Sequence, residues 1–516
     1  MSTSPDNEIG LDRESLTPPR VSLKVNAISN WAMLGVNIAV GLLLTPFVIS
    51  HLGQTTYGTW RLIISFVGYY GLLNLGVGSA ITRYIARYSG QGDLKSLNET
   101  ASTAMTMLSC TATLVVVASF FLAEPAARFF DVAPEHFSDF KRVVWILGLS
   151  AALGFFRSLF QAIVIAHESF VPTNIASIAV VLIRAGLVVL MLGLDKGLLG
   201  VAYATLISEA VAVLLQFLIY KSFAPRVRMQ FTSARWSVFR MLLVYGGVTT
   251  VIVAADIIRT HLDSFVIGKW IGLPQIGVYA IAAMLCGFMI RLIIAGMSVL
   301  TPRFASLDGA GEKLRLQRLF LKSLSISGFL AFGMSTIAII FGGRFIILWI
   351  SHDFAADAIP VLWIIATAYA FALSQNPGIG LMRALYKHHF YAVATMIEAA
   401  MNLSLSIWLA PKYGIIGVAL GTAIPMLIIK TLVMPIYVSR IAGVSILDYL
   451  RRLITPAILA ILMVYVSYLL GVLKFLNTCS LISLVAYGIL TGLMFAGLVL
   501  IISPLIGVPL LVRKRR

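Results

Sequence analysis

The chain has 516 residues, of which 59% are hydrophobic and only 12% are charged, and its mean hydropathy is +0.95. A soluble core cannot absorb that much apolar sequence, so the composition excludes a water-soluble globular protein and predicts a polytopic membrane protein. The formal net charge of +18 would favour nucleic acid as a partner of a soluble chain, but here the basic residues follow the predicted membrane topology, and we expect no nucleic-acid partner.

The apolar runs predict an all-α fold with about fourteen transmembrane helices. Each run is long enough to cross about 30 Å of hydrocarbon as a helix, whereas barrel strands would be about half that length. The first run has no small-residue cleavage site at its end, so we expect a retained span. The expected spans are residues 26–50, 60–82, 100–123, 141–166, 173–194, 200–222, 241–269, 277–300, 319–343, 358–385, 391–410, 415–438, 451–471 and 481–505.

Basic residues gather on one side of the predicted membrane. With the N-terminus in the cytoplasm, most Lys and Arg residues fall in inner segments, including the loop that contains Arg228 and Arg235 and the tail Arg513–Arg516. Acidic residues such as Glu124 and Asp131 fall in outer loops. Cytoplasmic loops carry an excess of Lys and Arg, so we expect both termini to be cytoplasmic and the basic segments to contact anionic membrane lipids.

Matching segments recur at an almost constant offset along the chain. The segment FVISHLG from Phe47 recurs as FVIGKWIG from Phe265, and LGVAYAT from Leu199 recurs as IGVALGT from Ile416. Such matches indicate an internal duplication. An even number of spans separates equivalent positions, so we expect two lobes of about six helices each, with a binding site between them. The expected parts are a cytoplasmic N-terminal segment (1–25), an N-terminal lobe (26–222), a basic cytoplasmic linker (223–240), a C-terminal lobe (241–438), and two further helices with a basic cytoplasmic tail (439–516).

Several charged side chains lie inside the predicted spans, where a central Asp or Arg costs roughly 3 kcal/mol to insert. Such residues need partners or water, which favours a hydrated cavity of the kind that a transport protein requires. Guanidinium groups bind phosphate oxygens in pairs, so a cavity with several of them suits a phosphate or diphosphate head group. The candidate substrate-binding residues are Arg61, Arg184, Arg259 and Arg291.

Four protonatable residues, namely Asp256, Asp263, His261 and Glu209, are candidates for coupling ion movement to transport, because burial raises the pKa of a carboxyl group toward neutral pH.

The same intramembrane charges have a structural alternative. Asp256, Arg259 and Asp263 share one helical face and would neutralise one another, and Glu209 would pair with Arg184. Arg157 and Lys430 would pair or extend to the interface, and Glu398 is either a packing device or part of a site.

The motifs of several other classes are absent. The sequence has no Walker A loop, no HExxH motif and no metal-spaced histidine cluster, and Cys110, Cys286 and Cys479 show no pairing or ligand spacing. We therefore expect no cofactor, no metal site, no catalytic residues and no enzymatic activity. A membrane glycan polymerase or ligase would need sizeable outer loops, and a major-facilitator carrier would have about twelve spans and a different loop between spans 2 and 3.

Two stretches carry a family resemblance. The run Asp263–Gly268 (DSFVIG), followed by Gly277–Ala280 (GVYA), resembles polysaccharide transporters of the multidrug/oligosaccharidyl-lipid/polysaccharide exporter superfamily. The glycine-rich turns at Leu199 and Ile416 and the plan of six, six and two spans resemble the same family, which includes Wzx-type O-antigen flippases and lipid II flippases.

The resemblance implies a flippase that moves an undecaprenyl-diphosphate-linked oligosaccharide, such as an O-antigen, capsule or exopolysaccharide unit, across a bacterial inner membrane by alternating access. It implies diphosphate-binding roles for Arg61 and Arg291, and a polysaccharide polymerase and chain-length machinery as partners. The first span lacks Arg and Lys, which departs from the lipid II flippase pattern and favours another glycan-lipid. The alternative within the superfamily is an ion-coupled exporter of drugs or organic cations. An excess of acidic residues in the cavity would favour it, but the basic residues within the spans slightly outnumber the acidic ones.

Overall fold

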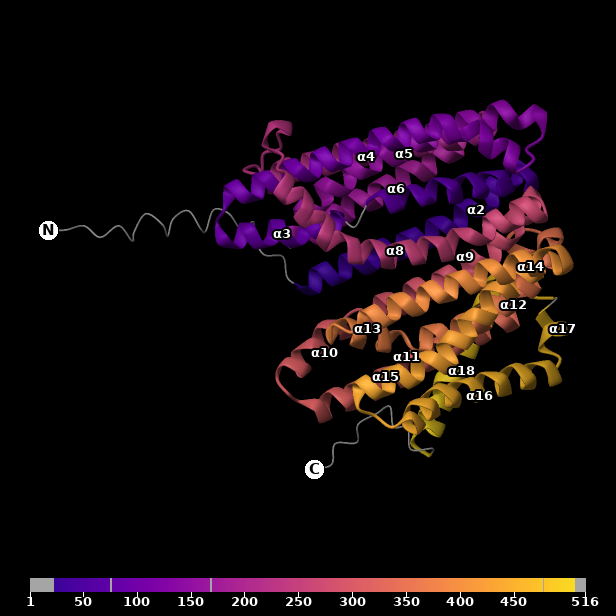
Figure 1. Cartoon of the computed structure of the whole chain (residues 1–516). Coiled ribbons are helices and arrows are strands. Elements are labelled where there is room, and N and C mark those ends of the chain that lie inside the picture. Colours follow the sequence, from indigo (N-terminus) through magenta and orange to yellow (C-terminus); the bar gives the residue numbers. More distant parts are fainter. Residues whose placement is uncertain (1–22, 75–76, 168, 477, 506–516) are drawn as a thin grey trace. The chain divides into compact units, whose positions relative to one another are not determined.

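The computed structural model describes residues 23–74, 77–167, 169–476 and 478–505. Within these ranges the chain is helical and contains no strand (Figure 1). Eleven of the described helical stretches are long and apolar enough to cross a membrane. The all-α polytopic membrane fold is therefore confirmed, while the number of about fourteen spans stays a prediction.

The chain divides into two compact units, Met1–His261 and Leu262–Arg516. In the first unit α5 packs on α4 and on α7, α7 packs on α6, and α6 packs on α2. The elements of this unit are α2 (Leu23–Gly68), η2 (Tyr69–Asn74), α3 (Val77–Gln91), α4 (Leu94–Phe129), α5 (Pro134–Ala166), α6 (Phe170–Gly193), α7 (Gly197–Phe223), η3 (Phe231–Ser233) and most of α8 (Trp236–Trp270).

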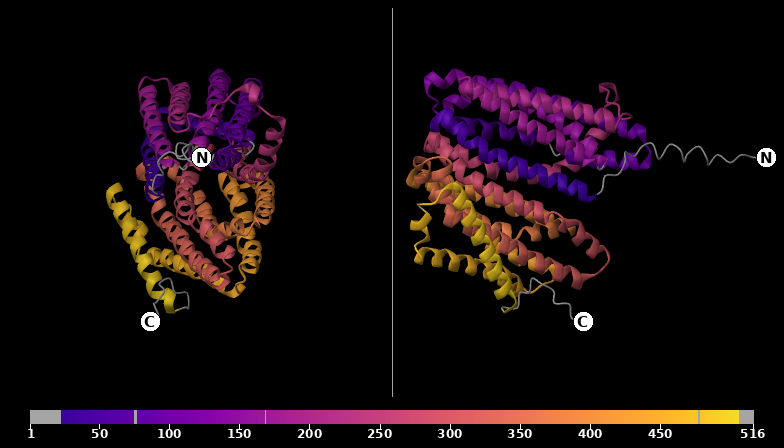
Figure 2. Two further views of the ribbon diagram at one scale, coloured as in Figure 1. Left: turned by 90° about the vertical axis from the view of Figure 1, so that its left-hand side faces the viewer. Right: turned by 180° about the vertical axis from the view of Figure 1, so that it is seen from behind.

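In the second unit α11 packs on α12 and on the C-terminal helices α16 and α18, and α12 also packs on α9 and α14 (α16 and α18 are yellow in Figure 2). The elements are the end of α8, α9 (Leu273–Met297), α10 (Leu300–Gly309), α11 (Lys313–Trp349), α12 (His352–Ser374), α13 (Asn376–Ala384), α14 (His388–Ile428), the π-helical turn η4 (Ile429–Val433), α15 (Met434–Ala442), α16 (Ile446–Leu469), α17 (Val472–Leu476) and α18 (Leu481–Leu505).

Helix contacts inside the first unit use small side chains, and its outer surface uses large apolar ones. Ala104 on α4 and Ala202 and Ser208 on α7 are fully buried, whereas Leu114 and Phe121 on α4 are more than half exposed. Small residues let helices approach closely where no hydrophobic effect drives them together. The exposed apolar side chains are those that a hydrocarbon environment accommodates, as expected for a membrane protein.

The first glycine of each copy of the duplicated turn has a positive φ. Gly197 (φ 52°), the first residue of α7, and Gly414 (φ 58°), within α14, both take a left-handed conformation that disfavours other residues. Three residues later, a Cβ on Gly200 would lie 2.7 Å from the Lys196 Cβ, and a Cβ on Gly417 would lie 2.3 Å from the Leu409 carbonyl oxygen. One glycine turns the chain and the next lets the new helix pack against the end of the preceding one, in both units.

Candidate functional site

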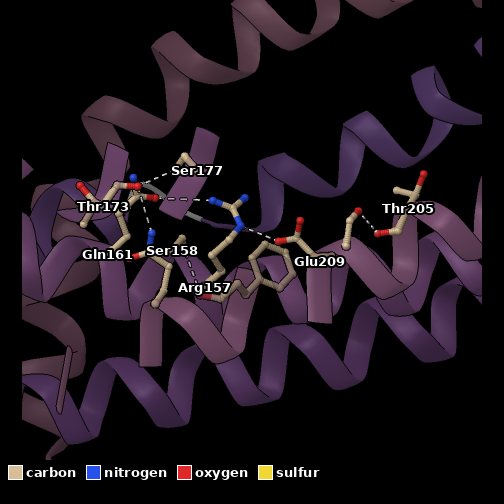
Figure 3. Close-up of polar contacts among 10 residues, drawn as sticks. Arg157, Ser158, Gln161, Thr173, Ser177, Thr205 and Glu209 are labelled. Carbon is tan, nitrogen blue, oxygen red and sulfur yellow. Dashed lines mark hydrogen bonds and ion pairs between the residues drawn. The ribbon is translucent and has the colours of Figure 1, made fainter. Parts of the chain in front are cut away.

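An ion pair joins α5 to α7 in the interior of the first unit. The Arg157 guanidinium donates from Nε to Glu209 Oε1 at 2.5 Å, and its Nη1 reaches Gln161 Oε1 at 3.5 Å. Figure 3 shows Arg157 between these two partners. A Cβ on Gly154, one turn before Arg157, would lie 3.3 Å from Glu209 Oε1, so the glycine leaves room for the carboxylate against α5. The Arg157 side chain is 36% exposed and that of Glu209 is 12% exposed.

A second guanidinium, from Arg184 on α6, lies within electrostatic reach of both members of this pair. Its Nε atom is buried and has no hydrogen-bond partner among the described residues. The hydrogen-bonded partner of Glu209 is therefore Arg157, and the expected pairing of Glu209 with Arg184 is not formed. Two arginines and one carboxylate together carry one net positive charge. Arg157, Arg184 and Glu209 are called the arginine cluster below.

A third arginine of the first unit, Arg61 on α2, lies near His261 on α8. Arg61 exerts an electrostatic effect on His261 and on the buried Tyr57, and its Nε is buried without a hydrogen-bond partner among the described residues. The His261 ring lies 5.9 Å from that of Tyr69, and a Cβ on Gly68 would fall 2.5 Å from its Nε2 atom. Two predicted candidates, Arg61 and His261, are thus brought together where the glycine leaves space for the imidazole.

Asp263, near the end of α8, is a buried carboxylate with two hydroxyl partners in the second unit. Tyr279 on α9 donates to its Oδ2 at 2.5 Å, and Thr422 on α14 donates to Oδ1 at 3.0 Å and to Oδ2 at 3.1 Å. These bonds tie three helices together around a carboxylate that is 6% exposed. The side chains of Asp256 and Arg259 lie outside the described residues, so the predicted pairing on one face of α8 is not described either.

Arg291 on α9 lies on the exposed face of its helix. The neighbouring Met289 and Ile293 are buried, whereas Arg291 and Ile294 are exposed. The guanidinium lies 6.0 Å from the ring centroid of Phe288 on the same helix, a weak cation–π contact. No acidic partner of Arg291 is found among the described residues.

The second unit also contains a sealed ion pair that the sequence left undecided. Lys430 Nζ lies 3.2 Å from Glu398 Oε2, with side-chain exposures of 5% and 2%. Lys430 stands on the π-helical turn η4, and its carbonyl accepts a hydrogen bond from Gln375 Nε2 at 2.5 Å. The two charges lie far apart in the sequence, and only the break at Gly414 folds them together, so no local spacing reveals the pair.

No group of three or more His, Cys, Asp or Glu residues that could hold a metal ion occurs in the described part of the chain. The cysteines Cys110, Cys286 and Cys479 are free. The polar groups described here are guanidinium, carboxylate, hydroxyl, imidazole and ammonium groups placed inside apolar helices, an arrangement suited to binding charged groups within a membrane.

The sequence and the fold of the chain resemble those of known proteins. The sequence profile of a polysaccharide biosynthesis protein family matches residues 52–360, which is more than half of the chain. A candidate O-antigen transporter of Shigella flexneri is 20% identical over 420 residues, covering 79% of this chain and 96% of that protein.

Solved structures show the same fold. The lipid II flippase MurJ in an inward closed conformation aligns with a TM-score of 0.70 at 17% identity, covering 92% of this chain and 98% of that one. An inward-facing multidrug resistance transporter of the MATE family, from the MOP superfamily, aligns with a TM-score of 0.67 at 15% identity, covering 81% of this chain and 98% of that one.

Proposed function

Because the chain belongs to the polysaccharide biosynthesis protein family, within the multidrug/oligosaccharidyl-lipid/polysaccharide exporter superfamily, we propose that it flips a polyprenyl-diphosphate-linked oligosaccharide across the bacterial inner membrane. The family resemblance expected from the sequence is confirmed. The observation that carries the proposal is the family match over residues 52–360. The candidate O-antigen transporter of Shigella flexneri, which this chain matches over most of its length, supports a glycan as the cargo.

The arginine cluster can supply the positive charge that a diphosphate needs in order to cross the membrane. A diphosphate cannot enter hydrocarbon without paired charges, because the insertion of a single charge already costs roughly 3 kcal/mol. Arg157 and Arg184 offer two guanidinium forks against one carboxylate, so the site has an unsatisfied positive charge where an anionic head group gains most. We assign the head group to Arg184 and Arg157, with Arg61, Arg259 and Arg291 as further cationic contacts during the passage.

Coupling of transport to an ion gradient needs a protonatable group, and Asp256, Asp263, His261 and Glu209 keep that proposed role. Asp263 is the one whose surroundings are most complete, since its two hydroxyl donors stabilise the ionised carboxylate and would have to rearrange when it is protonated. The basic segments place both termini on the cytoplasmic side in this proposal, and the polymerase and chain-length machinery act on the flipped product.

The proposal is tested by following lipid-linked glycan in cells that lack the protein and any redundant transporter. Head groups should accumulate in the inner leaflet, inaccessible to an outside-acting glycosidase or lectin, and wild-type protein supplied in trans should restore access. Normal outer-leaflet exposure without the protein would refute the proposal. Loss of cationic dye extrusion, with glycan exposure intact, would instead support the drug-exporter alternative.

A further inference from the structure

The carboxylate of Glu209 occupies the Nε side of the Arg157 guanidinium. Arg157 Nε donates to Glu209 Oε1 at 2.5 Å, while the buried Nε of Arg184, on the neighbouring helix, has no partner among the described residues. Resting on the proposed function, we propose that Glu209 is an internal counter-ion, which the substrate diphosphate displaces from Arg157 on binding and which re-pairs with Arg157 on release.

Charge balance favours this exchange. Arg157 and Arg184 carry two positive charges beside the single carboxylate of Glu209, so one positive charge is not compensated within the arginine cluster. A diphosphate carries more negative charge and more acceptor oxygens than a carboxylate, and it can bridge both arginines with paired hydrogen bonds. When the substrate leaves, Arg157 would be left as an unpaired charge inside the membrane, which is strongly unfavourable. The return of Glu209 removes that cost and prevents the diphosphate from being held too tightly.

The second unit supplies a contrasting pair for comparison. Lys430 and Glu398 are balanced one to one and sealed, with side chains 5% and 2% exposed, as expected for a permanent structural pair. The Arg157 side chain is 36% exposed, and its pair with Glu209 has the excess charge of Arg184 beside it. Gly154 presents no side chain to the carboxylate, so α5 itself does not hold Glu209 in place there. An open, unbalanced pair is the kind that an anion can enter.

The test uses the purified full chain in lipid nanodiscs and farnesyl diphosphate as the probe, with farnesol as its uncharged control. Glu209→Gln keeps the side-chain shape and removes the competing charge, so its affinity for farnesyl diphosphate should rise about tenfold, while its affinity for farnesol should not change. In vesicles the same variant should flip lipid-linked glycan more slowly than wild type, because release becomes limiting. Glu99→Gln removes a carboxylate paired with Arg235 at 3.5 Å in the same unit and should leave binding unchanged.

The variants also separate this inference from the function it rests on. Arg157→Gln and Arg184→Gln should each lower the affinity for farnesyl diphosphate. If neither does so, the head-group site of the proposed function is wrong. If both do so but Glu209→Gln gives no gain, or an equal gain for farnesol, only the counter-ion role is overturned.

The stability of each variant is measured together with its affinity, because a destabilised protein also binds less ligand. If Glu209→Gln lowers both the melting temperature and the affinity, then Glu209 is a fixed structural neutraliser and the inference fails. The double variant Arg157→Gln/Glu209→Gln removes both charges. It should keep wild-type stability without any gain in affinity, because Arg157, the guanidinium that the diphosphate would take over from Glu209, is gone as well. A gain in the double variant would contradict an exchange centred on Arg157.

Discussion

Ionisable residues inside this protein fall into two kinds that differ in balance and exposure. Glu398 and Lys430 are sealed and matched one to one, whereas Glu209 faces two arginines and stays partly accessible. Burial of a matched pair roughly offsets desolvation by attraction, but a surplus guanidinium keeps an unmet demand for an anion. The surplus charge of Arg184 is therefore the residue-level feature that points to a ligand rather than to packing.

Removal of that surplus charge is expected to damage transport more than folding. For Arg184→Gln we expect glycan flipping to fall by roughly 10- to 100-fold, the equivalent of about 1.5–3 kcal/mol for a lost charge-assisted hydrogen bond, with normal membrane insertion. Arg128→Gln is the matched control, because Arg128 pairs with Glu124 at 2.5 Å in an exposed position. Wild-type flipping by Arg184→Gln would exclude Arg184 as a head-group contact.

The hydroxyl partners of Asp263 are expected to matter mainly for stability. Tyr279→Phe or Thr422→Val each removes one donor and should lower the free energy of unfolding by about 0.5–1.5 kcal/mol, the range for hydrogen bonds between membrane helices. Unfolding in mixed detergent micelles measures this change. Thr367→Val is the control, since among the described residues that hydroxyl bonds to the Trp363 carbonyl of its own helix and to no other helix. If all three substitutions lowered the free energy of unfolding equally, the hydrogen bonds to Asp263 would contribute no more to stability than a hydrogen bond within one helix.

Sequence reasoning located most of these residues but not their partners. The insertion cost of charge singles out Arg184, Glu209 and Asp263, because each interrupts an apolar run. Helical periodicity describes neighbours on one helix only, so it could not tell that Arg157 rather than Arg184 holds Glu209, or that Asp263 is bound by hydroxyls from two other helices. The partner of each charged residue depends on how the helices pack together, and a single sequence does not contain that information.

At the scale of elements, the duplicated turn shows how a local sequence sets helix geometry. The first glycine of each GxxG segment has a positive φ, and the second lies where a side chain would meet the end of the preceding helix. The repeat was visible in the sequence because both demands exclude other residues. The path of the chain beyond Gly414, which folds Lys430 back onto Glu398, was not visible because it depends on the packing of α14 against α12.

The two turns should differ in their tolerance of a methyl group. In Gly417→Ala the new Cβ would meet the backbone oxygen of Leu409 at 2.3 Å, whereas in Gly200→Ala it would meet the side-chain Cβ atoms of Lys196 and Met191 at 2.7 and 3.0 Å. A Cβ atom is fixed by the backbone as a carbonyl oxygen is, so neither contact relaxes by side-chain rotation. The closer contact should cost more, and Gly417→Ala should destabilise more, by about 1–3 kcal/mol for an overpacked contact. Thermal unfolding in detergent compares them; equal losses would contradict the role of the carbonyl.

The sealed ion pair on η4 gives a second element-scale expectation. Lys430→Met leaves Glu398 as an unpaired buried charge and should cost about 3–5 kcal/mol of stability, whereas the double variant Glu398→Gln/Lys430→Met should recover most of it. Chemical unfolding of the three proteins measures the coupling. If the single variant were as stable as wild type, the pair would not be a stabilising contact of the second unit.

At the scale of the whole molecule, the composition and the length of the apolar runs determined the class of fold, and the chain order of its motifs determined the family. Both depend on properties that survive low sequence identity, namely hydrophobic length and glycine at turns with a positive φ. The profile match over residues 52–360 includes all three members of the arginine cluster, so the proposed head-group site lies in the part of the chain that shows the family. The family does not identify the glycan, because function depends on the side chains of a site rather than on the common fold.

The central claim is that a surplus of guanidinium groups in the first unit carries a diphosphate head group through the membrane. The most direct measurement is flipping of a polyprenyl-diphosphate-linked glycan in vesicles reconstituted with purified protein, comparing wild type with Arg157→Gln/Arg184→Gln. We expect rapid movement between leaflets with wild type and movement at the rate of protein-free vesicles with the double variant, at equal insertion and folding. Equal flipping by the two proteins would contradict the account.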